Sequence, residues 1–149
     1  CERLRAEAGG ADDVRALAAI RALEELRDAG AVEVLLDRLA DDGETIAEAA
    51  HRALRTITGH DLGRSRWRWG NFWRQARHQH RIEWLLKALA LPNDERRLFA
   101  SRELEALSGV ATGFAFDLPA PAREEARKRW EAWWNDTGRT RWDRRRRAT

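Results

Sequence analysis

The chain has 149 residues, of which 43% are hydrophobic and 36% are charged. This length suits one domain with its own core, and the hydrophobic fraction argues against disorder over most of the chain. The single cysteine, Cys1, excludes an internal disulfide framework and a cysteine-based zinc site. No apolar run approaches the roughly 18 residues of a membrane span.

Charge is distributed unevenly along the sequence. Residues 1–62 hold 14 acidic and 8 basic side chains, a net charge of −6, whereas residues 63–149 hold 11 acidic and 20 basic ones, a net charge of +9. Such an asymmetry can mark an interaction face or a basic tail.

The sequence begins at Cys1 and contains no methionine. A processed bacterial lipoprotein would begin with a cysteine in this way, so anchoring to a membrane surface is one alternative. The other is that the chain is a piece of a longer protein, and a cytoplasmic location is then the default expectation. Residues 1–8 predict a helix of only half the usual length, which favours the second alternative.

Residues 9–30 contain a helical pattern that recurs further along the chain. Four apolar residues match four others 31 positions later: Ala19, Ala22, Leu23 and Leu26 correspond to Ala50, Ala53, Leu54 and Ile57. Internal matches of this kind are typical of repeat proteins.

Residues 31–59 predict a pair of helices. The first, about 31–41, places Val32, Leu35, Leu36 and Leu39 on one buried face at spacings i, i+3, i+4 and i+7. An Asp-Asp-Gly turn at 41–43 ends it, and a second helix follows over about 44–58. Gly59 stands where a left-handed C-cap is expected.

The same pair recurs at 81–109, at an offset of 50 and without gaps. Nine of 29 positions are identical: Glu33/Glu83, Leu35/Leu85, Leu36/Leu86, Leu39/Leu89, Ala40/Ala90, Ala50/Ala100, Arg52/Arg102, Leu54/Leu104 and Gly59/Gly109. The second copy therefore predicts helices over about 81–91 and 94–108.

These leucine, alanine and glycine positions resemble the HEAT-repeat family, including the short bacterial repeats related to phycobilin-lyase modules. The resemblance covers residues 1–59 and 81–109 and implies an all-α solenoid of stacked antiparallel helix pairs, used mainly for binding. Some HEAT-like proteins are DNA glycosylases or bilin lyases. No residue set in this chain matches a catalytic motif, so we expect neither an enzyme nor a bound cofactor.

The chain departs from the family in an extra tryptophan-bearing helix after each repeat. The motif Trp-x-x-Phe/Trp-Trp occurs twice, in helices expected over about 66–79 and 121–136. The spacing puts three aromatic rings on one stripe of each helix, and we expect all six to be mostly buried: Trp69, Phe72, Trp73, Trp130, Trp133 and Trp134. The alternative is an exposed platform for nucleic-acid bases or sugars. Trp67 lies off the stripe, and we expect it at a partly buried rim.

The expected organisation is one repeat domain over 1–138, with repeats at about 1–30, 31–80 and 81–138, followed by a frayed basic tail at 139–149. Stacked repeats bury their apolar faces against neighbours, so uncapped ends would favour self-association.

A run between Gly63 and Ile82 has no acidic residue and supplies the candidate binding residues: Arg64, Arg66, Trp67, Arg68, Arg74, Arg77 and Arg81. Arginine binds carboxylates and phosphates bidentately. The alternative is a solvated face that only flanks the tryptophans. His78 and His80 lie about 200° apart on a helix, so we expect no metal site.

The sequence therefore predicts a non-catalytic scaffold that binds a protein partner with an acidic surface, through this run and the successive second helices of the repeats. The alternative is a nucleic-acid-binding module that uses the arginine- and tryptophan-rich C-terminal half.

Overall fold

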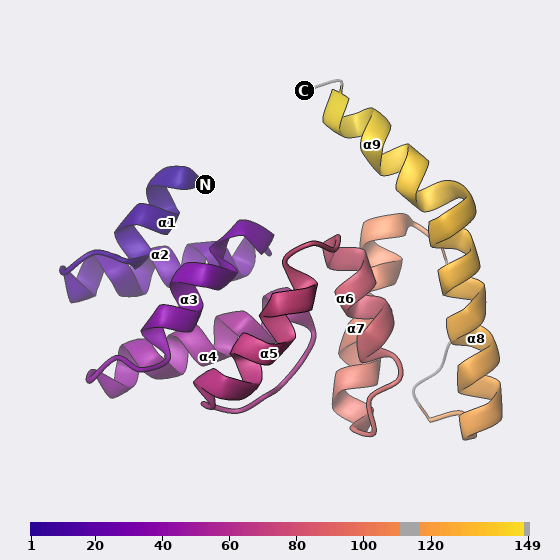
Figure 1. Cartoon of the computed structure of the whole chain (residues 1–149), viewed down its shortest axis with the longest axis horizontal. Coiled ribbons are helices and arrows are strands. Elements are labelled where there is room, and N and C mark those ends of the chain that lie inside the picture. The colour runs from indigo at the N-terminus through magenta and orange to yellow at the C-terminus, as the bar shows by residue number, and fades with distance from the viewer. Residues whose placement is uncertain (111–116, 148–149) are drawn as a thin grey trace. The chain divides into compact units, whose positions relative to one another are not determined.

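The computed structural model describes the backbone of residues 1–110 and 117–147, and the side chains of these residues up to Asp143. In this part of the chain the helices are the only regular elements and there is no strand, which confirms the all-α prediction (Figure 1). The chain divides into two compact units, Cys1–Trp84 and Leu85–Thr149. None of the helices in the described ranges is long and apolar enough to cross a bilayer.

The first unit contains two helix pairs followed by a fifth helix. In chain order its elements are α1 (Glu2–Ala8), α2 (Asp13–Glu25), the 3-10 turn η1 (Ala29–Ala31), α3 (Val32–Arg38), α4 (Glu44–Thr58) and α5 (Arg66–Ala76), and α6 (Arg81–Ala88) begins before the boundary between the units. α1 packs on α2, α2 packs on α4, and α3 packs on α4.

The helices predicted over about 44–58 and 94–108 lie where the sequence predicts them. α4 spans Glu44–Thr58, and α7 (Asp94–Ser108) spans the equivalent residues at an offset of 50. Each ends at a glycine in the left-handed conformation, Gly59 with φ 77° and Gly109 with φ 69°. A side chain with a β-carbon is strained there, so glycine ends both helices.

The first helices are shorter than predicted. α3 begins at Val32 after η1 and ends at Arg38 rather than near residue 41. The Arg38 guanidinium donates to the carbonyl oxygen of Ala8 at 2.7 Å and pairs with Asp41 at 2.7 Å, which ties the end of α3 to the end of α1. α1 lies where the sequence predicts a short helix, within residues 1–8, and it has seven residues, as α3 does.

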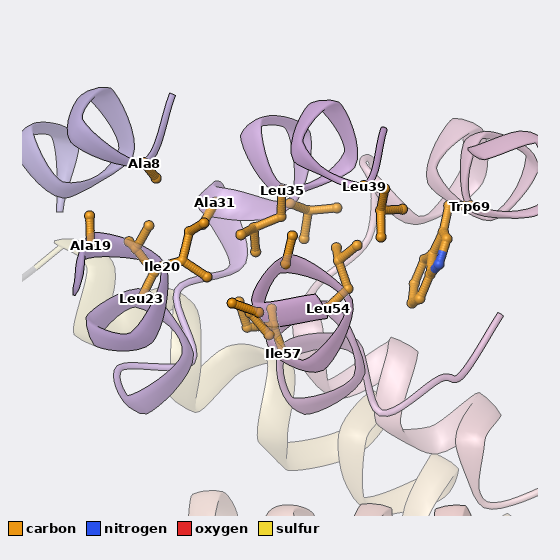
Figure 2. Close-up of a cluster of buried hydrophobic side chains, with 14 of the residues drawn as sticks. Ala8, Ala19, Ile20, Leu23, Ala31, Leu35, Leu39, Leu54, Ile57 and Trp69 are labelled. Carbon is orange, nitrogen blue, oxygen red and sulfur yellow. The ribbon is translucent and has the colours of Figure 1, made fainter. Parts of the chain in front are cut away.

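The core of the first unit lies between these helices (Figure 2). Leu35 from α3, Leu54 from α4 and Ile20 from α2 are each fully buried. Trp69 from α5 joins the same cluster beside Leu39 and Leu54. Burying aromatic and aliphatic side chains in this way gives α5, a helix with few apolar residues, its attachment to the repeats.

The tryptophan stripes are mostly buried. Trp69, Trp130 and Trp134 are 0%, 0% and 3% exposed, as predicted. Phe72, Trp73 and Trp133 keep a smaller part of their surface in solvent, and Phe72 and Trp73 pack against the core of the first unit, so these rings too are mostly buried. The indole N–H of Trp73 donates to the surface carboxylate of Glu33 at 3.2 Å.

The second unit contains the rest of α6, α7, and a long helical segment made of α8 (Ala120–Trp133), the π-helical turn η2 (Trp134–Gly138) and α9 (Arg139–Arg147). The prediction of a frayed tail after residue 138 is wrong. The Arg139 guanidinium lies 5.5 Å from the Trp134 ring centroid, and Arg141 donates to the carbonyl oxygen of Ser108 at 3.2 Å. These contacts fasten α9 where its like charges alone would oppose helix formation.

Candidate binding face on α5

α5 is fixed at its start by two local contacts. The Ser65 side chain accepts a hydrogen bond from the backbone N–H of Arg68 at 3.3 Å, which caps the helix. The indole N–H of Trp69 donates to the carbonyl oxygen of Gly63 at 2.8 Å while the ring is fully buried. With Trp69 turned inward, the opposite side of α5 faces solvent.

Arg81 does not belong to this solvent-facing surface, which corrects the sequence prediction. It is only 7% exposed. Its guanidinium donates to the carbonyl oxygens of Ile57 at 2.7 Å and Thr56 at 3.1 Å, at the end of α4. The last carbonyls of a helix lack partners within the helix, so Arg81 completes the C-terminus of α4.

Arg64 is held by two acidic residues of α4. It donates to Glu44 at 2.9 Å and to Glu48 at 3.3 Å. The hydrogen bond from Arg64 lowers the pKa of Glu44, and the hydrogen bond to Glu44 raises the pKa of Arg64. Two carboxylates of α4 thus neutralise the first arginine of the run.

Arg66 is more loosely held, with one nitrogen 3.5 Å from a carboxylate oxygen of Asp37. Asp37 and Glu33 both lie on α3, and Glu33 accepts the indole N–H of Trp73. One side of α5 therefore runs along the acidic surface of α3.

The outward side of α5 carries the remaining candidates. Trp67 is 75% exposed, more than a rim residue would be, and Arg68, Arg74 and Arg77 are also exposed. Arg74 hydrogen-bonds the side chain of Asn71. The side chains of Arg68 and Arg77 form no ion pair or hydrogen bond with the residues that the structure describes.

Residues 66–68 and 74–77 thus form what we call the α5 face: Trp67, Arg68, Arg74 and Arg77, with Arg66 at its edge. An exposed tryptophan beside unpaired guanidinium groups suits a partner that offers carboxylates or phosphates and a flat or apolar group. Within the described ranges there is no cluster of three or more metal-ligating His, Cys, Asp or Glu residues.

A second surface feature lies between α2 and α4. The sequence predicts binding through the successive second helices but does not identify a groove there. A surface groove of about 380 Å³ runs where the two packed helices meet, and its lining residues are Leu17, Arg21, Glu44, Thr45, Glu48, Ala49 and Arg52. The 31-residue offset already aligned α2 with α4, and it makes Arg21 and Arg52 equivalent positions. That equivalence was the signal that could have identified the groove.

The chain matches no protein-family model, no curated protein and no solved structure.

Proposed function

We propose that the chain is a non-catalytic protein-interaction module of HEAT-like repeats, and that its α5 face binds an acidic segment of a partner protein. The observation that carries the proposal is Trp67, 75% exposed between two exposed arginines on a helix without acidic residues. A large aromatic ring at the surface with arginines beside it is typical of binding hot spots.

The repeat part of the proposal rests on the agreement between equivalent elements. α4 and α7 have the same length and the same type of C-cap at an offset of 50, and α2 starts 31 residues before α4. Within the first unit, α2 packs on α4 as neighbouring repeats of a stack do.

The charge of the α5 face supports an acidic partner. Arg64 is already neutralised, but Arg68 and Arg77 form no ion pair with the described residues. Like charges on one helix oppose its formation by a few tenths of a kcal/mol per pair, about 0.2–0.5 kcal/mol. An anionic partner would remove this cost and would speed association at low salt.

A nucleic acid is the second candidate, because an exposed indole beside arginines also suits a base stacked next to a phosphate. The two candidates predict tighter binding of different ligands, an acidic peptide in the first case and a single-stranded nucleic acid in the second. Fluorescein-labelled oligoglutamate and labelled oligothymidylate can be titrated with the full chain over a range of salt concentrations, with fluorescence anisotropy as the readout.

The variant that tests the face reverses Arg68, Arg74 and Arg77 to glutamate. A matched control reverses Arg3, whose side chain is 91% exposed on α1. We expect the triple reversal to weaken oligoglutamate binding by about tenfold or more, and the control to leave it nearly unchanged. Equal binding by the triple variant would refute the proposal, and tighter binding of oligothymidylate would favour the nucleic acid.

A further inference from the structure

An arginine occupies the ninth position of all three second helices. These residues are Arg21 in α2, Arg52 in α4 and Arg102 in α7, and all three are exposed. Two of them, Arg21 and Arg52, line the groove between α2 and α4 from opposite sides. This shared position thus places one arginine of α2 and one arginine of α4 at the same groove.

The apolar part of the lining, which we call the floor, consists of Leu17, which is half-buried, and Ala49, which is 7% exposed. Val14 lies one turn before Leu17 on the same side of α2 and is 80% exposed. A volume of about 380 Å³ is near the lower end of the range for ligand pockets, so the groove suits a side chain or two rather than a large ligand.

Most charges in the groove already have partners. Glu44 and Glu48 are bound by Arg64, at 2.9 Å and 3.3 Å. Arg52 is bound by Glu24 at 3.0 Å, and the same carboxylate accepts a hydrogen bond from Thr56 at 3.1 Å. Arg21 is the lining charge that has no hydrogen bond or ion pair with the described part of the chain.

We infer that this groove binds a short acidic peptide segment of the partner that contains an aliphatic residue. The aliphatic side chain packs on Leu17 and Ala49 with Val14 at the rim, and a neighbouring carboxylate pairs with Arg21. The charge of Arg21 is the reason that the segment is acidic, and the apolar floor is the reason that it carries an aliphatic group.

The composition of the groove favours a peptide over a nucleic acid. Glu44, Glu48 and Glu24 lie in or beside it and occupy Arg64 and Arg52, so Arg21 is the lining arginine without a carboxylate partner among the described residues. A peptide can place one carboxylate at Arg21 and keep its other side chains away from these glutamates. A nucleic acid also has no aliphatic side chain to cover the floor.

This inference rests on the proposed function, since it assigns a second contact to the same class of partner. The test uses two labelled peptides of equal charge, one of glutamates with two leucines and one with alanines in place of the leucines. The titrated proteins are the full chain, the variant Arg21→Glu, the matched control Arg15→Glu on the same helix, and the triple reversal of Arg68, Arg74 and Arg77. Circular dichroism verifies that each variant keeps its helix content.

We expect the leucine peptide to bind the full chain about tenfold more tightly than the alanine peptide, because only leucine fills the floor. Arg21→Glu should abolish most of this preference, and Arg15→Glu should retain it. The triple reversal should weaken both peptides alike. Val14→Glu, at an 80% exposed site, provides a second variant that should also remove the preference.

Equal binding of the two peptides to the full chain, or a preference for leucine that persists in Arg21→Glu, would overturn the inference. A different result would contradict the proposed function. If the triple reversal leaves the alanine peptide unaffected while Arg21→Glu removes the preference for leucine, the α5 face is not the binding surface and the groove is. Oligothymidylate that competes with the leucine peptide and loses affinity in Arg21→Glu would assign the groove to nucleic acid instead.

Discussion

Arg5 and Asp28 form a bidentate ion pair that joins α1 to the segment after α2. The Arg5 Nε lies 2.6 Å from one carboxylate oxygen of Asp28, and a terminal nitrogen lies 2.7 Å from the other. Asp28 also accepts the backbone N–H of Gly30 at 3.3 Å. A β-carbon at Gly30 would collide with the Arg5 guanidinium, so the glycine leaves room for the pair.

The pair predicts a dependence of stability on pH. The hydrogen bond from Arg5 lowers the pKa of Asp28 below its ordinary value near 3.9, and this effect exceeds that of burial, which raises it. A lowered pKa in the folded state adds stability above the unfolded-state value, and this contribution is lost as pH falls through the folded-state value.

Asp28→Asn should therefore reduce the free energy of unfolding at pH 7 by about 1 kcal/mol, a value lowered for the partial exposure of Arg5. Urea denaturation at pH 7 and at several values below pH 4 measures the difference, which should shrink as the pH falls. Asp42→Asn, at an exposed site, serves as the control for removing one surface carboxylate. A difference that grew on acidification would contradict the assignment.

Truncation of two tryptophans that lie two residues apart should change the free energy of unfolding by very different amounts. Trp69 is fully buried in the core of the first unit, so Trp69→Ala should cost about 3–5 kcal/mol of unfolding free energy. Trp67 is 75% exposed, so Trp67→Ala should change stability by less than about 0.5 kcal/mol. Thermal or chemical denaturation of the two variants compares them directly, and similar losses would show that Trp67 also packs in the fold.

The sequence predicts the second helices well because their ends are chemically marked. Asn93 caps α7 through its side chain, and Gly59 and Gly109 end α4 and α7 in the left-handed conformation. These signals act within a few residues and can be read from the local sequence.

The role of Arg81 could not be predicted in the same way. Its guanidinium donates to carbonyls 24 and 25 residues earlier in the chain, and that approach depends on the tertiary placement of Arg81 beside the end of α4. The partners of Arg64, at separations of 16 and 20 residues, are tertiary contacts of the same kind. The sequence therefore identified the arginine run but could not separate its structural members from the exposed ones.

Self-association remains a prediction of the sequence. A stack of repeats with an unprotected apolar end should form dimers or larger species as concentration rises. Sedimentation velocity over a range of protein concentrations measures this, and a monomer at every concentration would contradict it.

Replacing two helical glycines by alanine should have opposite effects on stability. A β-carbon at Gly138 would lie 2.8 Å from an atom of the Trp133 ring and 2.9 Å from an atom of the Trp134 ring. Gly138→Ala should therefore destabilise the π-helical turn by about 1–3 kcal/mol, as overpacking does elsewhere. Gly70 lies inside α5 with open space around it, so Gly70→Ala should stabilise by about 0.5–1 kcal/mol. Thermal denaturation compares the pair, and a neutral Gly138→Ala would show that the rings can move aside.

Arg77 and Arg81 lie four residues apart in the sequence and should separate binding from stability. Arg81→Ala removes the donor from two carbonyls at the end of α4, so we expect a loss of about 2 kcal/mol in unfolding free energy. Below its melting transition this variant should still bind oligoglutamate like the parent, because Arg81 is 7% exposed and lies outside the α5 face. Arg77→Ala should do the reverse, with unchanged melting and weaker binding. Both quantities can be measured on the same samples by denaturation and fluorescence anisotropy. If Arg81→Ala kept its stability and lost binding, Arg81 would be a binding residue and not a structural one.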